Sequence, residues 1–435
     1  MSYSELQAGV GSRRSAQVMV IPLANAATPG QRLPESPNLL IINDRPSCAG
    51  PWTALAKLAA GVLQRRFSAL PRSSTRRLNT VYIIAGLILL LFLIPTELQA
   101  ANSCVVLQYH HFSESTPRIT SITPVQFDAQ LNYLAANNFH VMALRDVVLS
   151  LRHQIALPDK CVSFSIDDAY LSVYTSAYPA LSKRGWPFTV FVNSKAVDDK
   201  QKAMMNWQQM REMAKHGASF ENHSHTHLHM IRHKRNEGEA HWLQRIQRDI
   251  ETAQQRIIEE IGVAPTLFAW PYGEFNPALE KLISVLGLTG FGQQSGPLWP
   301  DADMSALPRF PMEAQYADLK GFITKVNSLP LPLVSATPKD PLLPIAKHRP
   351  TLTLQLAPGR YSRANLRCYL DGSDKVSMRW SSDETDVVHI TPLFDLQPGR
   401  HRSNCTMPSN QQGRFHWYSH NWFVRKDNGD WYAEY

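Results

Sequence analysis

Strand-like and helix-like segments alternate between Cys104 and Asn327. Cys104–Tyr109 and Cys161–Ile166 are short runs typical of buried strands, whereas Glu239–Ile261 repeats its apolar residues at helical spacing. Further strands are expected over 141–144, 188–192, 218–221, 267–270 and 288–291, and further helices over 171–184, 207–216, 277–286 and 318–327. Strands that alternate with helices predict a parallel sheet in an α/β fold. We expect a distorted (β/α) barrel of about seven strands.

The C-terminal part of the chain has a different pattern. Six prolines fall within residues 329–350, which predicts a stiff linker. Short alternating runs separated by turns occupy residues 351–435 and predict a small antiparallel, immunoglobulin-like β-sandwich. Trp417, Trp422 and Trp431 either line a sugar-binding face of this domain or pack within it.

The N-terminal part holds most of the excess positive charge. The whole chain has a formal net charge of +8, and residues 1–80 contain ten basic and three acidic residues. The folded part is therefore nearly neutral, which argues against a nucleic-acid partner. Residues 1–80 lack periodicity, and we expect them to be disordered or to precede the true start of translation.

An uncharged apolar run, Val81–Ile94, follows this basic segment. Fourteen residues are short for a membrane span and suit a signal peptide. Residues 81–100 are expected to be either a signal peptide or an N-terminal anchor in the inner membrane. Both predict export to the periplasm or cell envelope.

The five cysteines agree with export. Cys104 and Cys161 each open a predicted strand, so neighbouring parallel strands would bring their sulfurs to the same depth; the alternative is two buried thiols. Cys368 and Cys405 fall together in the β-rich region, and Cys48 is left over. Two exported pairs suit an oxidising compartment.

Two polar motifs follow predicted strands. Asp167 and Asp168 end the strand that begins at Cys161, and residues 223–229 place a histidine at every second position. Neutral imidazole is the commonest metal ligand in proteins, and one carboxylate can complete such a site while another acts as a base. Asp168, His223 and His227 would leave positions open for water and substrate. His225 and His229 offer the same spacing in a shifted register.

These motifs resemble those of the NodB-homology polysaccharide deacetylases, the family 4 carbohydrate esterases. The resemblance covers residues 103–328, so we assign the catalytic domain to residues 101–328. It implies that Asp167 is the general base, that Asp168, His223 and His227 bind the metal, and that the backbone N–H of Tyr272 stabilises the oxyanion. The family's arginine is absent ahead of Pro271. Arg309 is our candidate to orient Asp167 instead.

The catalytic acid also departs from the commonest family pattern. No Leu-x-His motif occurs between Tyr272 and residue 329, whereas the first predicted strand ends in Tyr109-His110-His111. This arrangement resembles the poly-β-1,6-N-acetylglucosamine N-deacetylases. The resemblance implies that His110 is the acid and that His111 has no catalytic role. Trp207 either lies near the substrate groove or packs at the start of a helix.

The resemblance implies a metal-dependent hydrolase that removes N-acetyl groups from an exported polysaccharide of N-acetylated amino sugars. A His₂Asp ligand set suits zinc but also other divalent first-row ions. Two alternatives stay open. In the first, the substrate is peptidoglycan or chitin oligomers. In the second, the chain is a catalytically silent carbohydrate-binding or assembly protein. The sequence does not predict the oligomeric state.

Overall fold

The computed structural model describes residues 102–359 and 361–433, and its first domain is built on a parallel sheet. Seven strands pair in the order β10-β1-β5-β6-β7-β8-β9, with β4 added beside β5. The strands of this domain are β1 (Cys104–Tyr109), β2 (His111–Phe112), β3 (Ser121–Ile122), β4 (His140–Val141), β5 (Cys161–Asp167), β6 (Phe188–Val192), β7 (Ala218–Asn222), β8 (Leu267–Ala269), β9 (Thr289–Phe291) and β10 (Phe310–Pro311).

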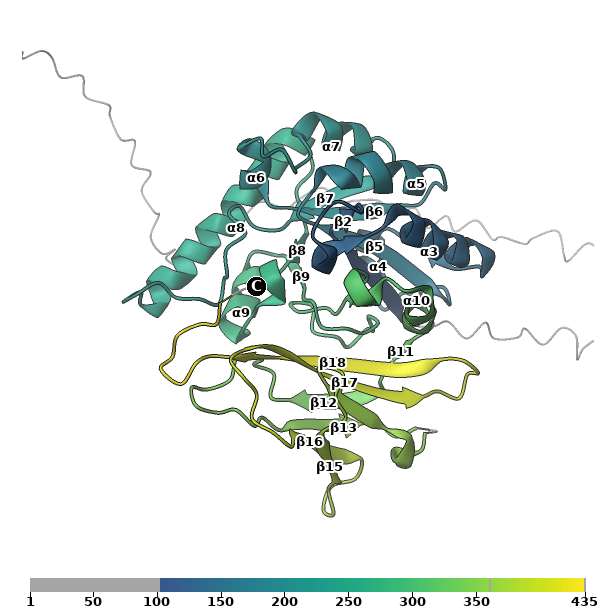
Figure 1. Cartoon of the computed structure of the whole chain (residues 1–435), viewed down its shortest axis with the longest axis vertical. Coiled ribbons are helices and arrows are strands. Elements are labelled where there is room, and N and C mark those ends of the chain that lie inside the picture. The colour runs from purple at the N-terminus through teal and green to yellow at the C-terminus, as the bar shows by residue number, and fades with distance from the viewer. Residues whose placement is uncertain (1–101, 360, 434–435) are drawn as a thin grey trace, which may run out of the picture. The chain divides into compact units, whose positions relative to one another are not determined.

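Helices follow most of these strands (Figure 1). They are α3 (Pro124–Ala136), α4 (Leu144–Arg152), α5 (Tyr178–Ser182), α6 (Ser194–Asp198), α7 (Trp207–Ala214), α8 (Glu239–Ile261), α9 (Pro277–Val285) and α10 (Leu319–Val326). Every residue of β1, β5 and β6 is buried, as expected for parallel strands that are covered on both faces.

The sheet curves into a barrel that is not fully closed. Its path ends at β9 and β10, and a single bridge from Phe291 to Leu307 links β9 to the segment that enters β10. All seven strands run parallel, so their carboxyl ends meet at one edge, where barrels of this kind carry their chemistry. The predicted distorted barrel is confirmed.

Helix boundaries follow local chemistry. Thr123 caps α3 in a capping box with Gln126, and Gly262 ends α8 in the left-handed conformation. The helix predicted over 171–184 is present over residues 171–182, but it contains a π-helical turn, Val173–Ala177, ahead of α5. Pro179 has no N–H to donate, so a regular α-helix cannot continue unchanged through this point.

The second domain consists of two four-stranded sheets, and the predicted sandwich is present. One sheet has the order β11 (Leu329–Pro330), β18 (Phe415–Val424), β17 (Gly399–Pro408) and β14 (Arg367–Leu370). The other has the order β12 (Leu333–Thr337), β13 (Leu352–Leu356), β16 (Val387–Pro392) and β15 (Val376–Trp380).

The segment predicted as a linker, residues 329–350, therefore differs from expectation, because β11 and β12 lie within it. The prolines of this segment are compatible with strands because β11 and β12 both lie at sheet edges, where a missing N–H costs little. The segment thus adds one strand to each sheet of the sandwich.

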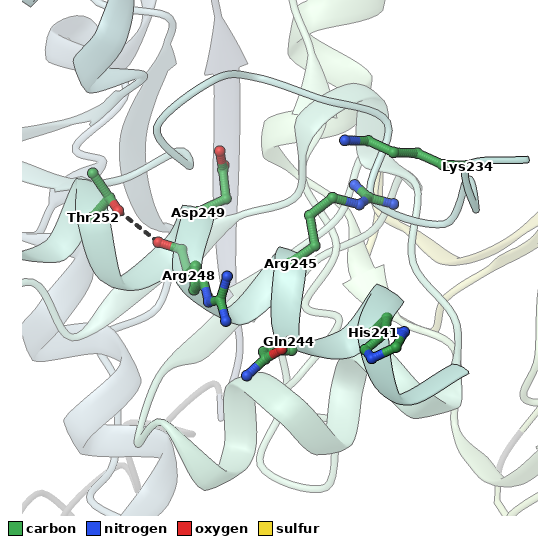
Figure 2. Close-up of a pocket in the computed structure, with 7 residues that line it drawn as sticks. All are labelled: Lys234, His241, Gln244, Arg245, Arg248, Asp249 and Thr252. Carbon is green, nitrogen blue, oxygen red and sulfur yellow. Dashed lines mark hydrogen bonds between the residues drawn. The ribbon is translucent and has the colours of Figure 1, made fainter. Parts of the chain in front are cut away.

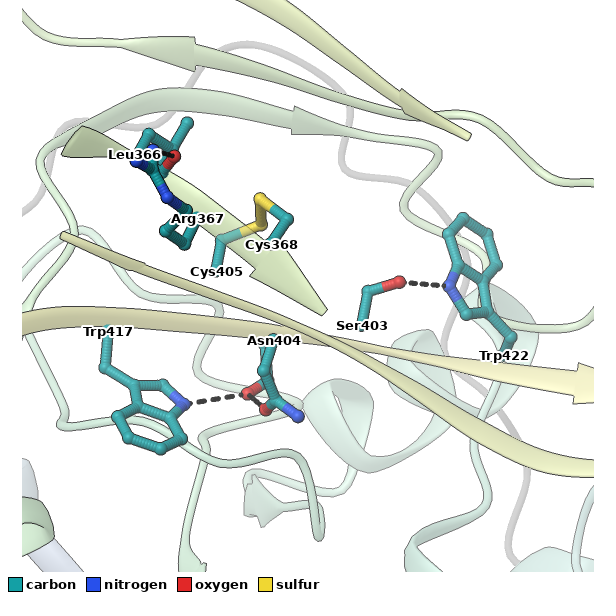
Figure 3. The surroundings of a disulfide bond; sticks show 9 residues. Leu366, Arg367, Cys368, Ser403, Asn404, Cys405, Trp417 and Trp422 are labelled. Atoms are coloured by element: carbon teal, nitrogen blue, oxygen red, sulfur yellow. Dashed lines mark hydrogen bonds between the residues drawn. A yellow bond between two sulfur atoms is a disulfide. The ribbon is translucent and has the colours of Figure 1, made fainter. Parts of the chain in front are cut away.

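Both predicted disulfides are present. Cys104 pairs with Cys161 across β1 and β5, and Cys368 pairs with Cys405 across β14 and β17. Figure 3 shows the second bridge with Trp422, whose indole donates to Ser403 Oγ at 2.8 Å. Trp422 is only 1% exposed and lies in the sandwich core, so it belongs to no open sugar-binding face.

The expectations for residues 1–100, including Cys48 and the apolar run Val81–Ile94, lie outside the described residues. Within the part that is described, no helix is both long and apolar enough to span a bilayer.

Candidate active site

Buried polar residues converge at the carboxyl edge of the sheet because each strand end supplies one. Asp167 ends β5 and is fully buried. Arg309 donates to its two oxygens from Nη1 and Nη2 at 2.7 and 2.9 Å, and Gln108 Nε2 donates to Oδ2 at 2.9 Å. Burial raises the pKa of Asp167, but the neighbouring Arg309 guanidinium and His110 lower it more strongly, to well below its usual range. Asp167 is therefore an ionised, rigidly oriented carboxylate.

Asp168, His223 and His227 form a candidate metal site. One donor atom from each lies within 4.8 Å of the others, and His227 Nε2 is 3.2 Å from Asp168 Oδ1. Ala269 O contacts His223 Nδ1 at 2.8 Å, which leaves Nε2 facing Asp168 at 3.6 Å. A metal-ligating histidine usually has its second nitrogen held in this way. Two imidazoles and one carboxylate on this spacing fit a divalent first-row ion.

The electrostatics of this cluster keep His223 and Asp168 in their metal-binding forms. Burial lowers the pKa of His223 to about 4, so its ring is neutral. Burial raises the pKa of Asp168, but His227 and His223 lower it overall, so the carboxylate is ionised. Asn193, which follows β6, donates to Asp168 Oδ1 at 3.1 Å and fixes the carboxylate.

The alternative histidines point to other partners. Ser194 Oγ contacts His225 Nδ1 at 2.8 Å, and Glu274 contacts His229 Nδ1 at 2.8 Å. The structure thus brings His223 and His227, rather than His225 and His229, to Asp168.

Asp249 of α8 holds the histidine loop in this register. Its carboxylate accepts the backbone N–H groups of His225 at 3.0 Å and Thr226 at 3.3 Å, and the Thr226 hydroxyl at 2.7 Å. Figure 2 shows Asp249 beside Arg248 and Thr252, where these side chains line a pocket along the helix. The helix therefore anchors the turn that aims His227 at the site.

His110 follows β1 and faces Asp167 from another side. Its Nε2 lies 3.8 Å from Asp167 Oδ2, and its Nδ1 lies 2.7 Å from Glu313 Oε1. Burial lowers the pKa of His110, but Glu313 and Asp167 raise it more strongly, to about 9. The imidazole is therefore protonated at neutral pH and able to act as an acid.

His111 has a different environment from His110. It is buried and stacks on Tyr170 with ring centroids 3.6 Å apart. The pKa of His111 is lowered to about 4, mainly by burial and to a smaller extent by the charge of His110. A neutral, stacked ring agrees with the predicted absence of a catalytic role.

Tyr272 lies in the helical turn Pro271–Gly273 after β8, with φ of 60°. Its ring contacts the ring of His227 at a centroid distance of 4.6 Å, so its side chain lies beside a residue of the candidate metal site. Asp168 and His227 also have positive φ, at 73° and 52°. Non-glycine residues in this strained region cluster at functional sites.

The sequence did not reveal several residues of the site: Gln108, Tyr170, Asn193, Asp249 and Glu313. Glu313 lies two residues beyond β10, which pairs with β1 and so brings it to His110. The sequence signal that could have indicated Glu313 is an acidic residue shortly after Arg309. Trp207, by contrast, is buried at the start of α7, where its Nε1 donates to Asp198 at 2.8 Å, and this supports the packing alternative.

Comparisons with known proteins relate the first domain to one family. Residues 154–291 match the family model described as polysaccharide deacetylase. YxkH of Bacillus subtilis (strain 168), whose name places it among polysaccharide deacetylases, is 28% identical over 207 residues, which cover 47% of this chain and 69% of the relative. The poly-beta-1,6-N-acetyl-D-glucosamine N-deacetylase of Escherichia coli (strain K12) is 25% identical over 261 residues, which cover 52% of this chain and 38% of the relative.

Among solved structures, the Streptococcus pyogenes deacetylase PplD in complex with acetate has a TM-score of 0.47 and 19% identity, covering 52% of this chain and 98% of that one. The family model includes Asp167, Asp168, His223, His227 and Tyr272, whereas His110, Arg309 and Glu313 lie outside its range and are placed by the sheet alone. Residues 154–291 therefore form a polysaccharide deacetylase domain by similarity to this family.

Proposed function

We propose that this chain is a metal-dependent N-deacetylase of an exported polysaccharide of N-acetylated amino sugars, similar to poly-β-1,6-N-acetylglucosamine. One observation carries the proposal. An ionised carboxylate, Asp167, lies between a candidate metal site and a protonated imidazole, His110. Hydrolysis of an amide needs this combination of a base, an electrophile and an acid.

A divalent ion held by Asp168, His223 and His227 would polarise the acetamide carbonyl and lower the pKa of the attacking water. Asp167 accepts a proton from that water, and Arg309 keeps its oxygens turned toward the site. The Tyr272 N–H donates to the oxyanion that develops on the carbonyl oxygen. His110 then gives its proton to the departing nitrogen, so the C–N bond breaks and acetate and a free amine are released.

The substrate and location rest on different observations. Relatives named as poly-beta-1,6-N-acetyl-D-glucosamine N-deacetylases favour that polymer, although the chain spans well under half of the Escherichia coli relative's length. Two disulfides favour an oxidising compartment, and so the periplasm or cell envelope.

The test is acetate release by the metal-loaded protein from β-1,6-linked N-acetylglucosamine oligomers, chitin oligomers and peptidoglycan. We expect release from the β-1,6-linked oligomers, loss of release on chelation, and recovery on adding zinc or another divalent first-row ion. Turnover of chitin oligomers or peptidoglycan alone would assign a different substrate. Glycan binding without acetate release from any of the three would refute the enzymatic proposal.

A further inference from the structure

The β-sandwich reaches the loop that carries Tyr272. Phe423 of β18 lies in the same apolar cluster as Trp270 and Phe275, which flank Tyr272 in the sequence. The rings of Phe275 and Phe423 meet edge to face at 6.3 Å. The second domain therefore packs directly against Phe275, shortly after the proposed oxyanion donor, within the cluster that also contains Trp270.

Arg400, at the start of β17, contacts Tyr272 itself. Its Nη1 donates to the Tyr272 carbonyl oxygen at 3.0 Å, and its Cζ lies 5.7 Å from the centre of the Tyr272 ring. The carbonyl and the N–H of Tyr272 belong to consecutive peptide units joined at its Cα. Fixing the peptide unit that contains the carbonyl limits the rotation of the unit that contains the N–H.

A second connection runs through Tyr432, which follows β18. Its hydroxyl donates to Glu274 Oε1 at 2.6 Å, and Glu274 is fully buried. The other oxygen of Glu274 contacts His229 Nδ1 at 2.8 Å. The His229 ring stacks on the Tyr272 ring with centroids 3.8 Å apart and an interplanar angle of 11°. The sandwich thus holds both the backbone and the ring of Tyr272.

We propose that the β-sandwich is part of the catalytic unit, because Arg400 and Tyr432 position the Tyr272 N–H for oxyanion stabilisation. This inference rests on the proposed deacetylase function. Tyr272 has a positive φ, which a tyrosine adopts only when its surroundings enforce it. Arg400 supplies that restraint to the backbone, and the Tyr432–Glu274–His229 chain supplies it to the ring.

The test uses the full chain with Arg400→Ala, Arg400→Lys and, as a matched control, Arg379→Ala. Arg379 is an exposed arginine of β15, in the other sheet of the sandwich. Acetate release from β-1,6-linked N-acetylglucosamine oligomers gives kcat and KM, and metal content is measured on the same samples. Because Arg400 is also exposed, the alanine variant should fold normally.

We expect Arg400→Ala to lower kcat about tenfold, less than the roughly 10²–10³-fold loss that follows removal of an oxyanion donor outright. KM and metal content should stay unchanged, Arg400→Lys should recover part of kcat, and Arg379→Ala should match the wild type. Tyr432→Phe, which removes one hydroxyl, should lower kcat in the same way but by less.

Three results would overturn the inference: an unchanged kcat in Arg400→Ala, a higher KM at unchanged kcat, or a loss of metal. The second would mean that Arg400 binds substrate, and the third that it supports the metal ligands. Absence of acetate release by the wild type would instead refute the proposed function, so the two failures are distinguishable.

Discussion

Replacing Glu313 with glutamine should move the alkaline limit of activity to lower pH. Glu313 lies 2.7 Å from His110 Nδ1, and glutamine keeps an oxygen there while removing the negative charge. In the proposed mechanism activity requires protonated His110, so it falls as the pH rises through the pKa of this residue. A variant with a lower His110 pKa therefore loses activity at a lower pH.

The contact between Glu313 and His110 sets the direction of this shift. Burial alone would lower the pKa of His110, yet it is raised from 6.5 to about 9, and Glu313 is the largest influence in the upward direction. Loss of its charge should lower this pKa by roughly 1–2 units, which is typical for one close opposite charge. That corresponds to about 1.4–2.7 kcal/mol of differential stabilisation of the imidazolium.

The assay is the pH profile of kcat/KM for acetate release, which reports the acid of the free enzyme. A bound divalent cation repels the imidazolium and lowers the limit in both proteins, so the difference between them is the quantity to compare. Glu251→Gln, on the exposed side of α8, is the matched control and should leave the profile in place. An alkaline limb that does not move in Glu313→Gln would refute the role of this pair.

Three further outcomes follow from the site. Asp167→Asn should lower acetate release by at least about 10²-fold with metal content retained, because it removes the base but no ligand; wild-type turnover would exclude this base. His223→Ala should lose metal while His225→Ala keeps it, as measured by metal analysis after dialysis. Arg309→Leu should lower the free energy of unfolding by about 3–5 kcal/mol at pH 7, because it removes the guanidinium that pairs with the buried Asp167 carboxylate. In urea titrations this loss should shrink in acid. The pKa of Asp167 is lower in the folded protein than its unfolded value of about 3.9, so the ionised carboxylate contributes stability above that unfolded value. This contribution is lost as the pH falls toward the folded pKa.

Periodicity was enough to predict the barrel and the sandwich. The runs at Cys104 and Cys161 were predicted to be strands of one parallel sheet, and the structure makes them neighbours in a register that places the two cysteines directly opposite each other. Asp167, Asp168, His223 and His227 were recognisable because each lies in a motif that follows a predicted strand. Local sequence carries this information, since a strand end fixes where the next side chains point.

Glu313 and the strands β11 and β12 needed tertiary information. Glu313 matters only because β10 pairs with β1, although about 200 residues separate them, and nothing in the local sequence reports that pairing. Residues 329–350 have the composition of a linker, but an edge strand tolerates proline, so composition alone did not distinguish the two.

Arg309 shows how the almost closed sheet compensates for the missing motif arginine. Its Nε donates to Gly292 O, just after β9, while Nη1 and Nη2 bind Asp167 at the end of β5. β9 and β10 are the two ends of the sheet path, and Arg309 immediately precedes β10. One guanidinium therefore joins the open seam of the barrel to Asp167, the proposed general base. The position ahead of Pro271 does not need an arginine, because the seam supplies an equivalent charge from the opposite end of the sheet.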